Sequence, residues 1–138
     1  MTLTEAAGGI ARLDWGGSGF DETSLLAAAR TQIEAYFAGR LRRFTIPLAP
    51  RATPFQHAFC EALFAIPYGE TRSYGRIARG LGVSPQAVGR ACAANPVPIL
   101  IPCHRVVAAN GPGGYSGAGG IATKLALLLL EGAPQRLL

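Results

Sequence analysis

The stretch Pro96–Val107, which reads PVPILIPCHRVV, constrains this chain most. Its apolar run Ile99–Ile101 has the length of a short buried strand. The run lies between two prolines, which cannot donate to a strand ladder, so we expect the strand to be short or at the edge of a sheet. The segment Pro102–Arg105 then places a cysteine, a histidine and an arginine at the end of a rigid apolar element.

Cys103 is a candidate nucleophile because a thiol reacts as its thiolate, which neighbouring polar groups can favour. The alternative is a packing role, since cysteine is among the most buried residue types. Adjacent side chains of a strand point to opposite faces, so the pairing of Cys103 with His104 in the sequence does not establish a contact. Both interpretations stay open on this segment alone.

The whole chain has 138 residues, of which 49% are hydrophobic, enough for one domain or a small domain with a short attachment. No apolar run approaches the roughly 18 residues that a membrane span needs. The N-terminus lacks the basic start and apolar core of a secretion signal, so we expect a cytoplasmic protein. Three cysteines without a CxxC pair favour free thiols and argue against a zinc site.

The net charge of +5 is concentrated in the second part of the chain. Residues 1–50 hold five basic and five acidic side chains, whereas residues 51–138 hold eight and three. Arginines between positions 72 and 90 predict a surface that faces phosphates. A solvated basic face without a ligand is the alternative.

The first third of the chain predicts one strand and one helix. Residues 9–15 alternate in polarity and suggest a strand. Ser24–Phe37 predicts a helix with Ser24 as its N-cap, since apolar residues recur every four positions along one face. Residues 40–52, with a basic cluster and two prolines, suggest a linker.

The rest of the chain predicts mainly helices. Thr53 to about Ile66 is a helix that begins with a threonine cap, a proline and a glutamine. Ser73–Leu81 and Ser84–Ala94, joined by a glycine turn, predict a helix-turn-helix over about 73–94. A last helix should run over Ile121–Glu131, after a loop over Ala109–Gly120 that has six glycines and the position of a substrate lid.

Six motifs occur in the same order as in one known family. They are Thr53–Gln56, Ile66–Glu70 with Ser73–Tyr74, Asn95–Pro98, Pro102–Val106, Gly114–Gly117, and Lys124 with Glu131–Gly132. Residues 53–138 thereby resemble the O6-alkylguanine-DNA alkyltransferases, the methylated-DNA–protein-cysteine methyltransferases. The resemblance implies a DNA repair protein that flips an alkylated guanine out of duplex DNA and takes the alkyl group onto its own cysteine in a single turnover.

The resemblance also implies a fold and a set of partners. We expect an α/β (α+β) protein with a shortened N-terminal α/β domain and linker, 1–52. A mainly helical alkyltransferase domain with a winged helix-turn-helix, 53–138, should follow it. The partner is double-stranded DNA containing O6-alkylguanine. We expect a monomer, without membrane attachment, metal or organic cofactor.

The family pattern assigns roles to individual positions. Cys103 corresponds to the nucleophile, His104 to its base acting through a water, Glu131 to the carboxylate that orients the histidine, and Asn95 to the hinge residue. Four residues correspond to contacts of the flipped base: Tyr74, Val106, Tyr115 and Ser116. Four residues of the second helix of the helix-turn-helix should meet DNA: Gln86, Ala87, Gly89 and Arg90. We expect Arg105 to have a structural role.

The chain departs from the family pattern in three places. Gln86 stands where relatives carry an arginine that fills the space of the flipped base; Arg90, one helical turn further, is a candidate replacement. The glycine stretch 117–120 is about two residues longer than usual, which affects the placing of Ser116. At most one strand replaces the usual early pair of strands.

Two other classes of protein use some of the same features. A cysteine peptidase also pairs cysteine with histidine, but its histidine is usually distant in the sequence. A binding protein, either a helix-turn-helix regulator or an alkyltransferase-like lesion sensor, would bind DNA without transfer. The sensors lack the acceptor cysteine, so Cys103 argues against them, and the small residues of the second helix suit the minor groove.

Overall fold

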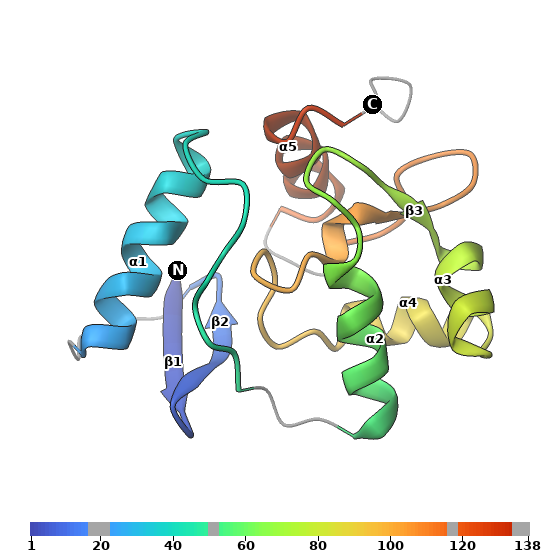
Figure 1. Cartoon of the computed structure of the whole chain (residues 1–138). Coiled ribbons are helices and arrows are strands. Elements are labelled where there is room, and N and C mark those ends of the chain that lie inside the picture. Colours follow the sequence, from blue (N-terminus) through green and yellow to red (C-terminus); the bar gives the residue numbers. More distant parts are fainter. Residues whose placement is uncertain (17–22, 50–52, 116–118, 134–138) are drawn as a thin grey trace. The chain divides into compact units, whose positions relative to one another are not determined.

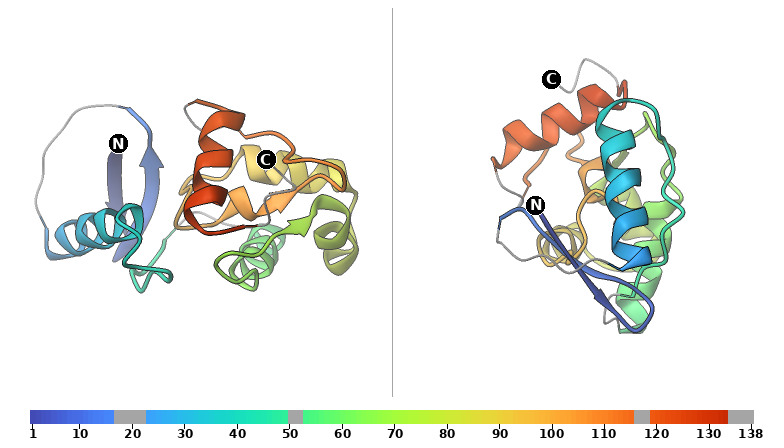
Figure 2. Two further views of the ribbon diagram at one scale, coloured as in Figure 1. Left: turned by 90° about the horizontal axis from the view of Figure 1, so that it is seen from above. Right: turned by 90° about the vertical axis from the view of Figure 1, so that its left-hand side faces the viewer.

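The computed structural model describes four parts of the chain, residues 1–16, 23–49, 53–115 and 119–133. They belong to two compact units, Met1–Arg51 and Ala52–Leu138 (Figures 1 and 2). Helices and strands are both present, as the α/β prediction requires. Among the described residues no helix is long and apolar enough to cross a membrane.

The first unit begins with a hairpin of two antiparallel strands, β1 (Thr2–Ala6) and β2 (Gly9–Asp14). The prediction of a single early strand was therefore wrong. Ala7 and Gly8 both have positive φ, 50° and 79°, which is the two-residue turn that suits the twist of a hairpin. The sequence did not reveal this turn because alanine rarely adopts that conformation.

Helix α1 (Ser24–Phe37) packs against this hairpin and buries Ala29, Ile33 and Tyr36 (Figure 1). Its N-cap is Thr23 rather than the predicted Ser24, because the Thr23 hydroxyl accepts a hydrogen bond from the amide of Leu26.

The segment predicted as a linker also belongs to the first unit. Residues 47–49 run along β2: the Ile10 amide donates to the Pro47 carbonyl and the Ala49 amide to the Ile10 carbonyl, each at 2.9 Å. The chain therefore leaves this unit only after Ala49.

The second unit starts with helix α2 (Pro54–Phe64), as the capping signal predicted. The hydroxyl of Thr53 accepts from the Gln56 amide, and the Gln56 side chain accepts from the Thr53 amide at 2.8 Å. This capping box satisfies two backbone donors at the helix start. Phe59 and Leu63 face the core.

The predicted helix-turn-helix is present as α3 (Tyr74–Leu81) and α4 (Pro85–Ala93). Each helix begins at a serine whose hydroxyl caps it, Ser73 and Ser84. Gly82 ends α3 with φ 69°, a left-handed conformation that glycine adopts without strain. The two helices pack on one another, so their connection is a tight corner (Figure 1).

The segment that ends in the cysteine is not a strand, so the prediction for Ile99–Ile101 was wrong. Ile99 has φ 75°, and the Ile101 amide donates to the Val97 carbonyl across a tight turn. Pro102 makes a second turn, with φ −81° and ψ 63°, over which the Cys103 amide donates to the Ile101 carbonyl at 2.8 Å. Two turns between closely spaced prolines leave no room for an extended ladder.

The chain then makes one 3-10 turn, η1 (Cys103–Arg105), and the short strand β4 (Val106–Val107). Strand β4 pairs in parallel with β3 (Arg72–Ser73), the residues immediately before α3. The pairing fixes the cysteine turn beside the start of the helix-turn-helix.

Helix α5 (Ile121–Leu130) closes the unit and contacts η1. Leu128 packs with Val107 and Ala133 in the core. The glycine loop precedes α5; its residues 116–118 lie outside the described part, so the predicted lid and the place of Ser116 stay predictions.

Candidate active site

Cys103 begins the 3-10 turn η1 and is only 5% exposed. Burial raises the pKa of its thiol, while a hydrogen bond from the Asn95 side chain and the charge of Lys124 oppose that shift. Because burial is the largest effect, Cys103 is a neutral thiol at neutral pH. The neighbours favour the thiolate only in part, so reaction requires a base to remove the proton.

Asn95 lies just beyond α4 and joins that helix to the cysteine segment. Its amide nitrogen Nδ2 donates to the Ile101 carbonyl at 2.9 Å, and its oxygen Oδ1 accepts from the Val97 amide at 2.9 Å. One side chain thereby ties the end of the helix-turn-helix to the turn that holds Cys103.

His104 and Glu131 meet inside the second unit although they are distant in the sequence. The distance between His104 Nε2 and Glu131 Oε2 is 2.7 Å, and both side chains are 0% exposed. An ionised carboxylate can only accept, so this contact assigns the ring proton to Nε2 and leaves a lone pair on Nδ1. Among the described residues His104 Nδ1 is buried and has no hydrogen-bond partner.

The environment of His104 keeps the ring neutral at neutral pH. Burial lowers its pKa, and the hydrogen bond and charge of Glu131 offset that effect only partly. A neutral, buried imidazole with a lone pair on one nitrogen can act as a proton acceptor.

Arg105 completes the buried polar group that Glu131 anchors. Its guanidinium donates Nε to Oε1 of Glu131 at 2.8 Å and Nη2 to Oε2 at 3.1 Å, a bidentate pair. Its Nη1 donates to the Ile66 carbonyl at 2.9 Å, and its Cζ lies 5.8 Å from the centre of the Tyr68 ring. This ion pair with Arg105 explains how Glu131 can lie just after the C-terminal end of α5, where the helix dipole disfavours a negative charge.

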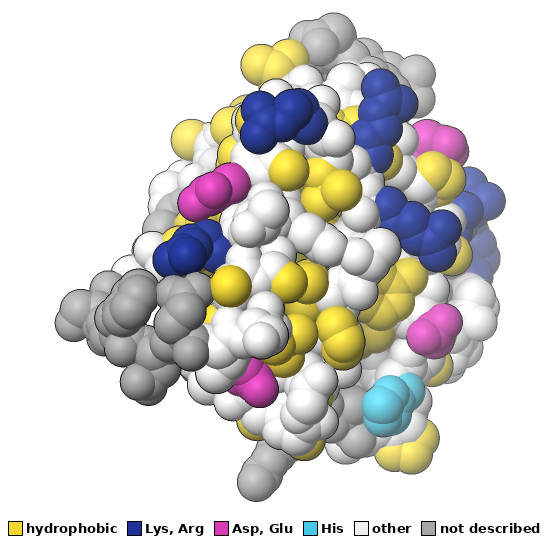
Figure 3. Space-filling model, turned by 60° about the vertical axis from the view of Figure 1, so that its left-hand side comes forward, with side chains coloured by type: hydrophobic (Ala, Val, Ile, Leu, Met, Phe, Trp, Pro, Cys, Tyr) yellow, Lys and Arg dark blue, Asp and Glu magenta, His cyan; other side chains and the backbone are white. Residues whose placement is uncertain are grey.

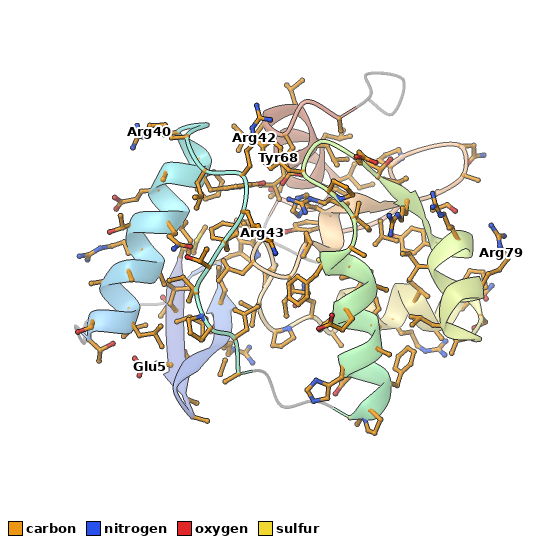
Figure 4. The ribbon with its side chains drawn as sticks, in the orientation of Figure 1. Glu5, Arg40, Arg42, Arg43, Tyr68 and Arg79 are labelled. Carbon is orange, nitrogen blue, oxygen red and sulfur yellow. The ribbon has the colours of Figure 1, made fainter. Side chains whose placement is uncertain are left out.

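Tyr68, in the loop after α2, contacts the end of α5 next to Glu131 (Figure 4). Its hydroxyl donates to the Leu130 carbonyl at 3.2 Å, the last residue of α5. The neighbouring Gly69 has φ 85°, and a Cβ there would lie 2.9 Å from the Glu131 carbonyl oxygen. Glycine is therefore required for the loop to approach Glu131 this closely.

A second group of polar contacts surrounds the residues that the family pattern assigns to the base. Tyr74 begins α3, and the buried Val106 lies in β4. Lys124, in α5, donates from Nζ to the Val106 carbonyl at 2.7 Å, the Gly114 carbonyl at 3.0 Å and the Tyr74 hydroxyl at 3.4 Å. Tyr115 lies in the loop before α5, and burial and the nearby Cys103 raise its pKa.

Sequence reasoning missed Lys124 as a site residue and the partner of Arg105. One signal was available, because Lys124 is the only lysine in a chain that otherwise uses arginine, and it stands within an apolar helix. The link between Arg105 and Glu131 had no such signal, since it depends on how α5 returns to η1.

The outer face of the helix-turn-helix carries small and basic residues. On α4, Gln86 and Arg90 are exposed, and Ala87 and Gly89 are partly exposed. On α3, Arg79 is exposed and points away from the unit (Figure 4). In the view of Figure 3 the basic side chains form separate groups, and acidic side chains lie among them.

The described residues contain no group of three histidine, cysteine, aspartate or glutamate side chains that could hold a metal ion. Cys60, Cys92 and Cys103 are free thiols. Burial and the nearby Cys103 raise the pKa of Cys92 to about 12, so Cys92 is protonated at neutral pH.

A helix-turn-helix next to a buried cysteine with a histidine–glutamate pair is the arrangement expected of a DNA-acting transferase. The family model described as "6-O-methylguanine DNA methyltransferase, DNA binding domain" matches residues 54–133. The chain belongs to this family.

Individual relatives agree with that assignment. A methylated-DNA–protein-cysteine methyltransferase of Methanosarcina acetivorans is 51% identical over 108 residues, 76% of this chain and 68% of that protein. The constitutive enzyme of that name from Bacillus subtilis is 45% identical over 113 residues, 80% of this chain and 67% of that protein. The crystal structure of Mycobacterium tuberculosis OGT in complex with DNA matches with a TM-score of 0.79 and 41% identity, covering 98% of this chain and 89% of that one.

Proposed function

We propose that this chain repairs O6-alkylguanine in double-stranded DNA by transferring the alkyl group to Cys103, once per molecule. The observation that carries the proposal is the buried His104–Glu131 pair directly after the buried Cys103. Family membership supports the reaction type. Residues 53–138 would form the transferase domain and residues 1–52 its shortened N-terminal partner.

The reaction exchanges one proton for one alkyl group. His104 Nδ1 accepts the Cys103 proton through a water, and Glu131 and Arg105 hold the ring in the required tautomer. Sulfur forms a bond to the alkyl carbon while the carbon–O6 bond breaks and leaves its electron pair on guanine. The guanine takes up one proton, so the proton lost by the Cys103 thiol is balanced by the proton gained by the guanine. The thioether cannot readily leave, which limits each molecule to one transfer.

The alkylated base has to leave the duplex before it can reach a buried thiol. Tyr74, Val106, Tyr115 and Ser116 would receive the base. Gln86, Ala87, Gly89 and Arg90 would face the DNA, since the small residues of α4 allow a close approach to the minor groove. Arg90 would replace part of the arginine that relatives carry at position 86, because it is exposed one turn further along the helix.

We further propose that the protein acts as a cytoplasmic monomer without a metal or organic cofactor. Its free cysteines support a location in a reducing compartment such as the cytoplasm. A monomer is sufficient because one chain contains the thiol, the base and the DNA-binding helices.

Stoichiometry tests the proposal. A duplex with a single O6-methylguanine is mixed with increasing protein, and the methylated base that remains is counted. We expect the loss to stop at one methyl group per protein molecule, and Cys103→Ser to remove none. Cys60→Ser is the matched control, because this thiol lies on α2 outside the site and should leave the stoichiometry unchanged. Removal of more than one methyl group per protein molecule would contradict a single transfer to Cys103. Loss of activity in Cys60→Ser, with activity kept in Cys103→Ser, would exclude Cys103 as the acceptor.

A further inference from the structure

Cys92 is a second thiol near the proposed acceptor, and the mechanism above gives it no role. It lies near the end of α4 and is partly exposed. The buried Val88 stands four residues before it and Asn95 three residues after it, which places all three on one side of the helix. The Cys92 side chain therefore lies on the inner side of α4.

Asn95 connects Cys92 to the turn that holds Cys103. Its backbone amide donates to the Cys92 carbonyl at 3.2 Å. Its side-chain nitrogen donates to the Ile101 carbonyl at 2.9 Å, and the Cys103 amide donates to the same oxygen at 2.8 Å. The Asn95 side chain also makes a hydrogen bond with the Cys103 thiol. Each cysteine is thus one hydrogen bond away from the same asparagine.

The two thiols also share their polar neighbours. The Lys124 ammonium donates to the Tyr74 hydroxyl at 3.4 Å. Burial has the largest influence on the pKa of both of these groups, and the charges of Cys92 and Cys103 come next for both. Cys92 and Cys103 therefore belong to one cluster of groups, between the end of α4, the start of α3 and the cysteine turn.

We propose that hydrogen peroxide oxidises Cys92 and Cys103 to an intramolecular disulfide, which blocks the acceptor thiol until a reductant cleaves the bond. Both cysteines are free thiols in this structure, which is the reduced form. The loss of repair on oxidation rests on the proposed function, whereas the disulfide itself does not.

The oxidation takes place in two steps that together consume one peroxide. The Cys103 sulfur attacks one oxygen of hydrogen peroxide and the O–O bond breaks, which gives a sulfenic acid and one water. The Cys92 sulfur then attacks the Cys103 sulfur and displaces its oxygen as a second water. The two thiols lose two electrons, which reduce the peroxide, and their two protons end in the waters.

Cys103 is the thiol that reacts first. In the proposed mechanism His104 accepts the Cys103 proton, and the same transfer prepares the sulfur for attack on peroxide. Burial and the nearby Cys103 raise the pKa of Cys92 to about 12, so Cys92 reacts slowly with free peroxide. Beside the sulfenic acid it reacts within the molecule, where proximity replaces collision.

The disulfide would preserve an acceptor that the protein can use only once. A sulfenic acid without a partner thiol is oxidised further to a sulfinic acid, which thiol reductants do not reduce. Capture by Cys92 ends the oxidation at a bond that thiol exchange reverses.

The test compares wild-type protein, Cys92→Ser and Cys60→Ser. Cys60 lies on α2 and is not among the charged neighbours of the other two described thiols, so its variant is the matched control. The reduced proteins are treated with excess hydrogen peroxide in the absence of DNA, the remaining thiols are alkylated, and the peptides are mapped without reductant. Methyl transfer from an O6-methylguanine duplex is then measured before oxidation, after oxidation and after treatment with dithiothreitol.

We expect wild-type protein and Cys60→Ser to yield a peptide pair joined through Cys92 and Cys103. Their transfer should fall in proportion to this bond and return fully with dithiothreitol. Cys92→Ser should transfer like the wild type when reduced, but its oxidised fraction should stay inactive after dithiothreitol, because Cys103 becomes a sulfinic acid. Wild-type protein that has first reacted with the methylated duplex should form no disulfide, because its Cys103 sulfur is a thioether.

A joined pair that includes Cys60, the absence of any joined pair, or full recovery of oxidised Cys92→Ser would overturn the inference. The wild-type peptide map requires no variant, so it decides the question if Cys92→Ser does not fold. Reduced wild-type protein that transfers no methyl group would instead contradict the proposed function, and the peptide map would still test the disulfide.

Discussion

Replacement of Arg105 by methionine should show how strongly the buried network around Glu131 supports the fold. The guanidinium makes two hydrogen bonds to Glu131 and one to the Ile66 carbonyl. Its side chain is 10% exposed and that of Glu131 is 0% exposed, so solvent screens the pair little. Arg105→Met leaves the Glu131 carboxylate buried without its bidentate guanidinium, and the neutral His104 ring does not compensate its charge.

The expected loss follows from these contacts. Breaking a buried ion pair by removing one partner lowers stability by about 3–5 kcal/mol. The lost hydrogen bond to a buried carbonyl adds about 1–3 kcal/mol, although the two effects overlap. Since domains of this size have free energies of unfolding of about 5–15 kcal/mol, the variant should lose a large part of its stability.

The measurement is urea unfolding followed by circular dichroism at the helical signal, extrapolated linearly to water. The double variant Arg105→Met/Glu131→Gln leaves no unpaired buried charge, so it should be more stable than Arg105→Met alone. A loss below about 1 kcal/mol for Arg105→Met, typical of an exposed pair, would refute the reasoning. A double variant no more stable than the single one would refute it as well.

Three further predictions concern single residues. Burial lowers the pKa of His104 from 6.5, so its neutral form persists as the pH falls to 6.5. The transfer rate should therefore stay level down to that pH and fall only below it. A fall that is already complete at pH 7 would contradict the role of His104 as the proton acceptor. Ile99 is buried with φ 75°, so Ile99→Ala should lower the free energy of unfolding by about 2–5 kcal/mol. Ile99→Gly removes about 1–2 kcal/mol of left-handed strain as well, so in the same urea assay it should be no less stable than Ile99→Ala. Arg90→Ala should weaken both binding to the alkylated duplex and repair, with Arg40→Ala, an exposed arginine of the first unit, as the control; unchanged binding and repair in Arg90→Ala would remove Arg90 as the replacement for the missing arginine at position 86.

Local signals in the sequence predicted most of the helices. The caps are examples: the hydroxyls of Thr53, Ser73 and Ser84 each accept from the backbone amide three residues on, and the Gln56 side chain accepts from the Thr53 amide. Such patterns can be recognised without the tertiary structure. Gly82 is equally local, because a left-handed residue ends a helix wherever it stands.

The turn before the cysteine could not be predicted from local patterns. Ile99 is β-branched and apolar, which favours a strand, yet it adopts a left-handed conformation that costs energy. Packing of the residues around it, which are all buried, overrides that preference. The hairpin turn at Ala7 was missed because alanine rarely adopts a positive φ; this turn is exposed and follows from the pairing of β1 with β2.

The candidate site shows a similar division. The motif order predicted His104, Glu131 and Asn95, and the fold brings these residues to the cysteine segment. The bidentate pair of Arg105 and the three hydrogen bonds of Lys124 connect residues from different elements, and only the tertiary fold reveals them.

The central claim is that Cys103 accepts the alkyl group, and a mass spectrum tests it most directly. The intact protein is weighed before and after mixing with a duplex that contains one O6-methylguanine, and its peptides are then mapped. We predict the gain of one methyl group, located on Cys103 and absent from Cys103→Ser. Binding of the duplex without a gain in mass, or a methyl group on Cys60 or Cys92, would contradict the account.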